Sequence, residues 1–319
     1  MIKHLRKAFA LIIGIIFIIM VFDFLEIKDL DVRSIKSQYF NWKIILCIGF
    51  YCISHCIRAL RLYIISGDVN ASLKALFIEQ FKTNGVNLIL PFKLGEAYRF
   101  VRFKKVFNSG FTSINTIIIE RFFDFFALAF LFCIGLFLFP NEVTEIQNTL
   151  IGVMLVLFVL LVAVLSMEDI VLMIHKRLLY RFQNSLSFSL LKFSHDFLMN
   201  LREAKKVLKT KSVSILSFTF LIWSFELLSL FMFFAELNYR IDLLILLAVF
   251  IAFSSLLPNG PLGFGGVQLS FYTVFLLYSD FDNYLVASTA YTIYIFGSGI
   301  VISLLLFITN FIKKANGKK

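Results

Sequence analysis

The sequence has little charge, little proline and little cysteine. Charged side chains make up 16% of its 319 residues, whereas a soluble domain is roughly a quarter charged. With so few charges and 60% hydrophobic residues, the chain is excluded from the soluble globular and the disordered classes. Phenylalanine is abundant, with 41 residues, and only 4 prolines interrupt the chain. We therefore expect an all-α protein, a polytopic bundle of membrane helices that forms a single domain over residues 1–319.

The four cysteines are too few and too badly spaced for a disulfide scaffold or a structural metal site. All lie in apolar runs, at Cys47, Cys52, Cys56 and Cys133. Cys52 and Cys56 are four residues apart, but no second pair completes a tetrahedral ligand set. The four histidines show no ligand spacing either. We expect free thiols packed within helices, no metal site and no cofactor.

Long apolar runs predict about eight membrane crossings. Six runs are long enough for a crossing helix, which needs at least ~17 residues, and they cover 8–25, 44–66, 113–139, 149–166, 212–235 and 284–312. The first run follows a basic start, as in a signal peptide, but no small-residue cleavage site follows it, so we expect an uncleaved helix. Two shorter runs, 242–257 and 265–278, flank the break LPNGPLGFGG. They predict two thin crossings or one re-entrant hairpin.

A second re-entrant segment is predicted before the basic stretch 93–105. Residues 72–91 are apolar overall but carry Glu79, Gln80, Lys82 and Asn84. This set is too polar to face lipid, so we expect an amphipathic or re-entrant helix buried against other helices. The run ends in LPFKLG, which LPNGPLG echoes at 257–263. Matching breaks in two halves are typical of transporters, and they suggest half-repeats at 1–166 and 212–319.

The basic excess of the chain indicates its orientation. The net charge of +11 would suggest nucleic acid for a soluble protein, but no nucleic-acid motif is present and we expect no such partner. Of the 31 Lys and Arg residues, 21 fall in 1–7, 93–105, 167–211 and 313–319, and 5 fall in the segments between the alternate runs. Because Lys and Arg collect on the cytoplasmic side, both termini are predicted inside, in the cytoplasmic (inner) membrane. The basic amphipathic connector 167–211 lies on the anionic inner leaflet or is a plain loop.

Ionisable residues inside the predicted crossings are the main pointer to a site. In the run 44–66, Ser54, His55, Arg58 and Arg61 follow steps of three and four and share one helix face. Each buried charge costs about 2.5–3.5 kcal/mol on insertion scales, so such residues are retained for a purpose. Two alternatives stay open: a cationic site for a phosphate or carboxylate, and structural ion pairs with acids of other helices.

Two other predicted crossings supply the acids. Glu120 and Asp124 are four residues apart and share a face, with Arg121 beside them. They can pair with the arginines, bind a cation or relay a proton. Glu226 lies in the middle of the run 212–235, where a carboxyl group is either protonated or paired. No further residues complete a hydrolase or transferase site, so we expect no enzymatic activity.

Three segments resemble the signatures of one membrane-protein family. They are Asn84–Arg99 (NGVNLILPFKLGEAYR), Glu120–Asp124 (ERFFD) and Pro258–Gln268 (PNGPLGFGGVQ). Together they are similar to the lysylphosphatidylglycerol-synthase transmembrane-region family, also called flippase-like proteins, whose signatures are N-x-x-LP-x-x-x-GE-x-x-R, ER-x-x-D and a late PGGLG-x-x-E. The third segment departs from its signature, because Gln268 stands where the family usually has Glu. That difference argues against an acid–base role at this position.

The resemblance implies a domain that moves an anionic phospholipid or a lipid-linked sugar headgroup between leaflets. The implied substrate-binding residues are Arg58, Arg61, Asn87, Glu96, Arg99, Glu120, Arg121, Asp124 and Glu226. The implied breaks, which would supply backbone donors and a gate, are Pro91, Gly95, Pro258, Gly260, Pro261, Gly263, Gly265, Gly266 and Gln268. Some relatives carry a soluble synthetase after the last crossing, whereas seven residues follow Ile312 here, so we expect the stand-alone form.

Two other functions fit the same pattern. A polyprenyl-lipid-dependent glycosyltransferase would need an acid on a sizeable external loop, and only 26–43 offers the room, with Asp29 and Asp31. A non-catalytic scaffold would bring lipid- or glycan-synthesis enzymes together, and its buried charges would serve assembly alone. Membrane lipids are the expected partners in every case.

Overall fold

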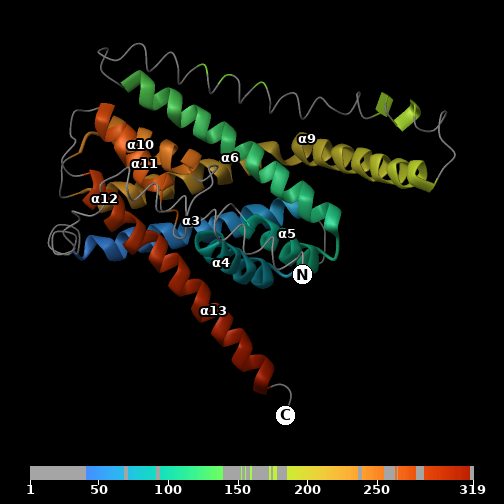
Figure 1. Ribbon diagram of the computed structural model, residues 1–319, viewed down its shortest axis with the longest axis horizontal. Coiled ribbons are helices and arrows are strands. Elements are labelled where there is room, and N and C mark those ends of the chain that lie inside the picture. The colour runs from blue at the N-terminus through green and yellow to red at the C-terminus, as the bar shows by residue number, and fades with distance from the viewer. Residues whose placement is uncertain are drawn as a thin grey trace, which may run out of the picture.

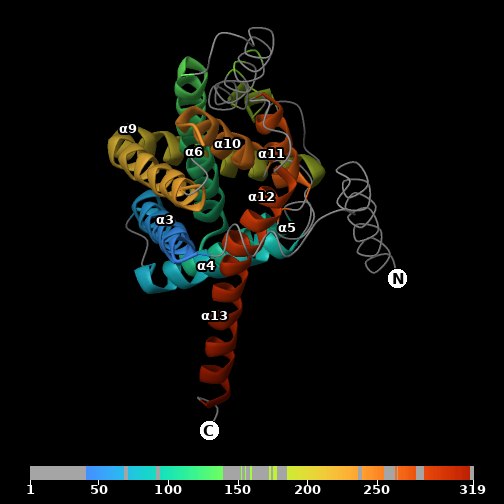
Figure 2. The ribbon, with the colours of Figure 1, turned by 90° about the vertical axis from the view of Figure 1, so that its left-hand side faces the viewer.

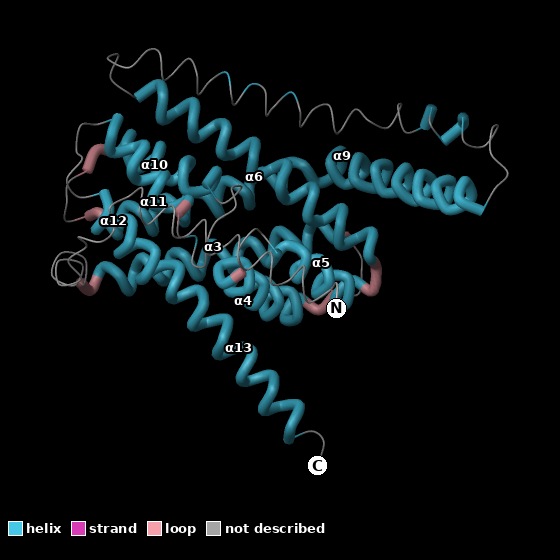
Figure 3. The backbone as a smooth tube through the Cα atoms, in the orientation of Figure 1, coloured by secondary structure: helices cyan, strands magenta, loops and turns pink. Residues whose placement is uncertain are grey.

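The computed structural model describes residues 41–67, 71–90, 94–138, 185–235, 239–254, 263, 265–277 and 284–316, together with 152, 155, 159, 172–173 and 175–177. Every element described is a helix (Figures 1 and 3), which confirms the all-α prediction for this part of the chain. The elements are α3 (Lys43–Ser66), α4 (Leu73–Ile89), α5 (Leu94–Phe107), α6 (Gly110–Leu138), α9 (Ser185–Phe233), α10 (Ile241–Ser254), α11 (Gly266–Leu277), α12 (Tyr284–Tyr291), the π-helix η4 (Thr292–Phe296) and α13 (Gly297–Asn316).

Within the part of the chain that the structure describes, three helices are long and apolar enough to cross a membrane. They cover Lys43–Ser66, Arg202–Phe233 and Tyr284–Asn310, and α10 and α11 are shorter apolar helices. These helices agree with a polytopic membrane bundle. The predicted run 8–25, and the run 149–166 except for residues 152, 155 and 159, lie outside the described residues, so the number of crossings and the inside position of both termini stay predictions.

The helix α3 lies antiparallel to α9. Ser229 Oγ donates to the Cys47 carbonyl at 2.9 Å, near the start of α3, and Lys211 Nζ donates to the Ile64 carbonyl at 3.1 Å, near its end. The helix α6 also runs opposite to α3, because Arg61 meets Glu120 whereas Arg58 meets Asp124. These directions agree with the predicted order of crossings, in which the second runs against the third and the fifth.

The helix α9 is longer than the sequence analysis expected. It continues without interruption over 49 residues, so the predicted boundary between connector and crossing, at 211 and 212, is not a break. At about 1.5 Å per residue, residues 185–210 extend well past the end of α3, as Figure 1 shows. The later part of the predicted connector therefore continues the membrane helix rather than forming a separate segment.

Two short helix pairs enter the bundle from opposite ends. In the first pair, α4 and α5 run antiparallel, since Asn87 contacts Glu96 near the turn and Glu79 contacts Arg102 farther away from it. Both free ends of this pair lie beside the end of α3, in an apolar cluster of Leu62, Ala71, Leu76, Phe103 and Phe107. The start of α4 and the end of α5 therefore lie at the same end of the bundle, and the contact between Asn87 and Glu96 lies at the other end of the pair.

The second pair, α10 and α11, starts at the other end. Gly135, near the end of α6, packs on Leu246 of α10, and Phe253 of α10 reaches Phe125, at 6.2 Å between ring centroids. The helix α11 then runs back, so that Phe275 packs on Tyr239, at 5.3 Å between ring centroids. With 14 and 12 residues, these helices are roughly 20 Å long, shorter than a hydrocarbon core of about 30 Å.

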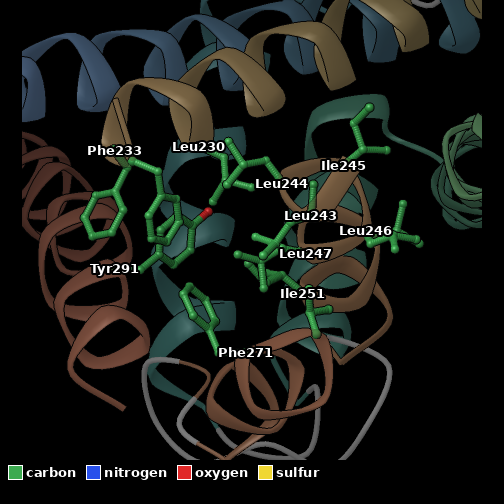
Figure 4. Close-up of a cluster of buried hydrophobic side chains, with 14 of the residues drawn as sticks. Leu230, Phe233, Leu243, Leu244, Ile245, Leu246, Leu247, Ile251, Phe271 and Tyr291 are labelled. Atoms are coloured by element: carbon green, nitrogen blue, oxygen red, sulfur yellow. The ribbon is translucent and has the colours of Figure 1, made fainter. Parts of the chain in front are cut away.

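The largest apolar core lies at the end of the bundle where α10 and α11 enter. Figure 4 shows it between α9, α10, α11 and α12, with Leu230, Leu244, Leu247, Phe271 and Tyr291 directed toward one another. The helix α13 instead leaves the bundle in both views (Figures 1 and 2), and its contacts lie mainly on α4. The core thus holds one end of the bundle together, whereas small residues hold α13 to α4.

The crossing of α4 and α13 depends on Gly85. A methyl group at this position would fall well inside van der Waals contact with the side chain of Ser303. We expect Gly85→Ala to force the two helices apart and to destabilise the protein by about 1–3 kcal/mol. The apparent melting temperature of the detergent-purified protein measures the loss.

Two variants control this prediction. Gly49→Ala adds a methyl group that meets no atom within 4 Å and should leave the melting temperature unchanged. Adding Ser303→Gly to Gly85→Ala removes the clashing side chain and should restore most of the stability. Equal melting temperatures for Gly85→Ala and Gly49→Ala would contradict this account of the crossing.

Candidate functional site: a chain of alternating charges

The arginine stripe predicted on α3 faces the acids predicted on α6. Arg61 is fully buried, with 0% of its side chain exposed. It donates to Asp124 at 2.7 and 3.2 Å, to Glu120 Oε1 at 2.9 Å and to Thr219 Oγ1 of α9 at 2.8 Å. A guanidinium that meets two carboxylates at such distances in a dry site holds three helices together.

Arg58 lies one turn away and is held more loosely. Its nitrogens are 3.5 Å from Asp124 Oδ2 and 3.4 Å from Glu226 Oε1, at the outer limit of a hydrogen bond. Its guanidinium lies 5.6 Å from the Trp223 ring centroid, a cation–π distance, and 13% of its side chain is exposed. Arg58 therefore has weaker ties to its acids than Arg61 has.

The start of α5 extends the ion pairs away from α3. Arg99 forms a short hydrogen bond to Glu120, and one of its other nitrogens lies 3.8 Å from Glu96. Glu96 in turn accepts a short hydrogen bond from Arg121, and Asn87 Nδ2 donates to it at 3.4 Å. The predicted substrate-binding residues of the family resemblance are thus brought together from five helices, α3, α4, α5, α6 and α9.

These contacts form one line of alternating charges, which we call the charge chain. Four acids and four arginines contribute, so their formal charges cancel. In order along the line they are Glu226, Arg58, Asp124, Arg61, Glu120, Arg99, Glu96 and Arg121. This arrangement agrees with both alternatives from the sequence, structural ion pairs and a cationic site for a phosphate or carboxylate. The same arginines form the ion pairs and lie together where such a ligand could bind.

Several buried donors of the charge chain have no acceptor among the described residues. They are the Nε–H groups of Arg58, Arg61 and Arg99. Such groups are rare in folded proteins and ask for a specific explanation. The oxygens of an anionic ligand are suitable acceptors for them, because arginine presents its N–H groups in a fork that matches phosphate and carboxylate.

Comparison with protein-family models tests the resemblance directly. Residues 8–305 match the model described as the lysylphosphatidylglycerol synthase TM region. The chain belongs to this family. It is therefore a multi-pass membrane protein, and the resemblance drawn from its three segments is confirmed. The comparison with curated proteins found no similar chain, and the comparison with solved structures found none either.

The third family segment has a structural role at the start of α11. Gly263 and Gly265 have φ values of +73° and +96°, a backbone conformation that favours glycine. Gln268 is completely buried, accepts from the Gly265 N–H at 2.8 Å and lies 3.4 Å from Thr292 Oγ1 of η4. Gly266 is the first residue of α11. The predicted break residues Pro91, Pro258, Gly260 and Pro261 lie outside the described residues.

Gly95, the break residue of the first family segment, is a site of close contact. A methyl group there would collide with the Asn87 side chain and would lie 2.5 Å from the Asn87 Cα. The absence of a side chain at Gly95 lets the first turn of α5 approach α4. That approach brings Glu96 and Arg99 to the charge chain.

The sequence analysis missed several polar contacts around the charge chain. Arg102 donates to Glu79 at 2.6 Å, and Asn84 Nδ2 donates to the Tyr51 hydroxyl at 2.7 Å. Glu79 and Asn84 were recognised as too polar for lipid, but spacing along the chain assigned them no partner. Within the described residues, no cluster of three His, Cys, Asp or Glu side chains is arranged to hold a metal ion.

Proposed function

We propose that this protein moves an anionic phospholipid or a lipid-linked sugar between the leaflets of the cytoplasmic membrane. The charge chain is the observation that carries the proposal. A headgroup phosphate is too costly to bury alone in hydrocarbon, whereas an arginine that is paired with a carboxylate can exchange that partner for the phosphate. The unpaired Nε–H groups of Arg58, Arg61 and Arg99 are the donors that favour such a ligand.

The two opposed helix pairs support the same proposal. Each pair is short, each is entered from its own end of the bundle, and both reach toward the level of the charge chain. Asn87, near the turn of the first pair, contacts Glu96, and Phe253, near the turn of the second, contacts Phe125, next to Asp124. Broken or short helices that meet at mid-depth from both sides are typical of transporters, in which the site opens alternately to each side.

Each end of the charge chain is partly accessible, whereas its middle is dry. The side chain of Glu226 is 17% exposed at one end, and Arg121 is half-exposed at the other. In the proposed function, a headgroup enters at an accessible residue and displaces a carboxylate from its arginine. The lipid tails stay in the bilayer throughout, so the protein needs to shield only the headgroup.

Lipid movement in liposomes tests this function. The purified full chain is reconstituted with a fluorescent phosphatidylglycerol, and the probe in the outer leaflet is bleached with a membrane-impermeant reductant. We expect Arg58→Ala and Glu96→Ala each to slow exchange between leaflets about tenfold or more, which corresponds to a rise of roughly 1.4 kcal/mol in the activation barrier. Arg177→Ala, at an exposed position, is the matched control. Exchange at the wild-type rate in both site variants, with the fold intact, would refute the assigned roles.

A translocator of this kind catalyses no covalent step, and its partners are membrane lipids. The glycosyltransferase alternative predicts that a polyprenyl-phosphate sugar is consumed when an acceptor is present in the same liposomes. The scaffold alternative predicts that the wild-type protein exchanges no lipid in liposomes. It also predicts that enzymes which co-purify with the wild type no longer co-purify with variants of the charge chain. The proposal predicts neither result.

A further inference from the structure

We infer that Glu226 takes up one proton when an anion binds to Arg58, so that the anion and the proton occupy the charge chain together. This inference rests on the proposed function and adds to it a coupling ion and the residue that binds it. In the arrangement described, four carboxylates balance four guanidinium groups. One added anionic charge in a low-dielectric layer would be expensive, and one proton on a carboxylate restores the balance.

Arg58 is the arginine best suited to exchange partners. Its distances to carboxylate oxygens are 3.4 and 3.5 Å, whereas Arg61 has contacts of 2.7 and 2.9 Å. The side chain of Arg58 is also in part exposed, and its Nε–H has no acceptor among the residues that the structure describes. An anion at Arg58 therefore replaces two weak contacts, whereas an anion at Arg61 would have to break strong ones.

Glu226 is the acid that such an exchange leaves without a cation. Asp124 keeps Arg61, which holds both of its oxygens. Glu226 keeps only a hydroxyl contact, from Ser54 Oγ to its Oε1 at 2.7 Å. An uncompensated carboxylate in a layer that is largely dry is costly, and binding of a proton removes that cost; the partial exposure of Glu226 gives water access to it.

Ser54 is arranged to accommodate the protonated acid. Its Oγ lies 2.7 Å from Glu226 Oε1 and 2.8 Å from the Tyr51 carbonyl oxygen. A hydroxyl group has one hydrogen, so it cannot donate to both oxygens at once. If Glu226 carries a proton on Oε1, the acid donates to Ser54 and Ser54 donates to Tyr51, and both contacts are satisfied without movement.

The same oxygen controls Arg58. Oε1 is the Glu226 atom that faces both Ser54 and Arg58. Once this oxygen holds a proton and donates it to Ser54, it no longer attracts the guanidinium. Protonation of Glu226 and release of Arg58 to an anion are therefore one event. When the anion leaves on the other side, Arg58 returns to Glu226 and the proton is released to water.

The other groups around Glu226 favour a neutral acid rather than a second ion pair. The phenols of Tyr51 on α3 and of Tyr291 on α12 lie near enough to Glu226 to interact with it electrostatically. On α6, Asp124 stands on the far side of Arg58. The charged residue of α10 is Asp242, which pairs with Arg240 at 2.9 Å. Arg58 is thus the cation that the described helices bring within contact of Glu226.

Calorimetric binding tests the coupling. Short-chain dioctanoyl-phosphatidylglycerol is titrated into the detergent-purified full chain in two buffers that differ in ionisation enthalpy, which gives the number of protons taken up. We expect one proton per lipid for the wild type, with the apparent affinity strengthening by about tenfold per unit fall in pH while Glu226 is ionised in the free protein. Glu226→Gln, which resembles the protonated acid, should bind with no proton uptake and no pH dependence between pH 6 and 8.

Glu203→Gln makes the same substitution at an exposed position of α9 and should keep the proton uptake. Ser54→Ala is a second variant in case Glu226→Gln does not fold. It removes the hydroxyl that accepts from the protonated acid, so the increase in lipid affinity on acidification should begin at a lower pH than in the wild type. Wild-type binding without proton uptake, or equal uptake in wild type and Glu226→Gln, would overturn the inference and leave lipid translocation standing. Coupled binding without any exchange in liposomes would support it and overturn translocation. No binding of the lipid at all would overturn both.

Discussion

Arg61→Met is expected to prevent the protein from folding stably. The substitution leaves Glu120 and Asp124 in a dry layer with one of their cations removed, and it also removes the hydrogen bond to Thr219. Breaking a buried ion pair by deleting one partner costs about 3–5 kcal/mol, a large share of the stability of a typical protein. We expect the yield of monodisperse protein after detergent extraction to fall to a small fraction of the wild-type yield.

A second substitution should recover much of this loss. In Arg61→Met combined with Asp124→Asn, the three remaining arginines of the charge chain match its three remaining acids, Glu226, Glu120 and Glu96, one to one. Recovery by the double variant would show that the charge imbalance, rather than lost packing, causes the defect. Arg177→Met, at an exposed position, should have no effect. Normal yield of the single variant would refute the structural role assigned to Arg61.

Gly95→Ala is expected to abolish most lipid movement while it leaves the protein folded. The added methyl group collides with Asn87, so the first turn of α5 must move away from α4, and it carries Glu96 and Arg99 with it. Misplacement of a site residue by about 1 Å can cost up to 10²-fold in rate. We expect exchange of fluorescent phosphatidylglycerol to fall about 10- to 100-fold, and stability to fall by only about 1–3 kcal/mol.

A second glycine-to-alanine substitution serves as the matched control for Gly95→Ala. Gly110→Ala, at the start of α6, adds a methyl group whose nearest neighbours are 3.7 Å away or more. It should exchange lipid at the wild-type rate. If Gly95→Ala does the same, the close approach of α4 and α5 does not position the charge chain for transport.

The sequence indicated which residues could meet, but neither that they do nor how strongly each is bound. Helical spacing predicts Arg58 and Arg61 on one face and Glu120 and Asp124 on another, and pairing of the two faces is one of the alternatives that the sequence leaves open. Local spacing contains no information on the distance across helices. The short contacts of Arg61 and the longer contacts of Arg58 with carboxylate oxygens therefore follow only from the packing of α3 between α6 and α9.

The short helices were also predicted in part. Polar residues in an apolar run predicted an amphipathic or re-entrant helix at 72–91, and two runs too short for a full crossing predicted two thin crossings or one re-entrant hairpin at 242–278. The helices found there are short. That they enter from opposite ends follows from tertiary contacts such as Gly135 with Leu246, which no periodicity reveals. The sequence does not predict the full length of α9, because its composition changes from basic to apolar at 211, within the helix. A helix continues across such a change when no glycine or proline interrupts it.

The π-helix η4 sets the phase of the last helix. It lies between α12 and α13 in a continuous helical segment, and a wide turn of this kind inserts one extra residue into the α-helical repeat. One residue corresponds to a rotation of roughly 100° about the helix axis. Without the wide turn, the surface of α13 that bears Gly299 and Ser303 would rotate by that angle away from Gly85 of α4. The extra residue in the π-helix Thr292–Phe296 therefore sets the rotation of α13 about its axis, so that its small residues face α4.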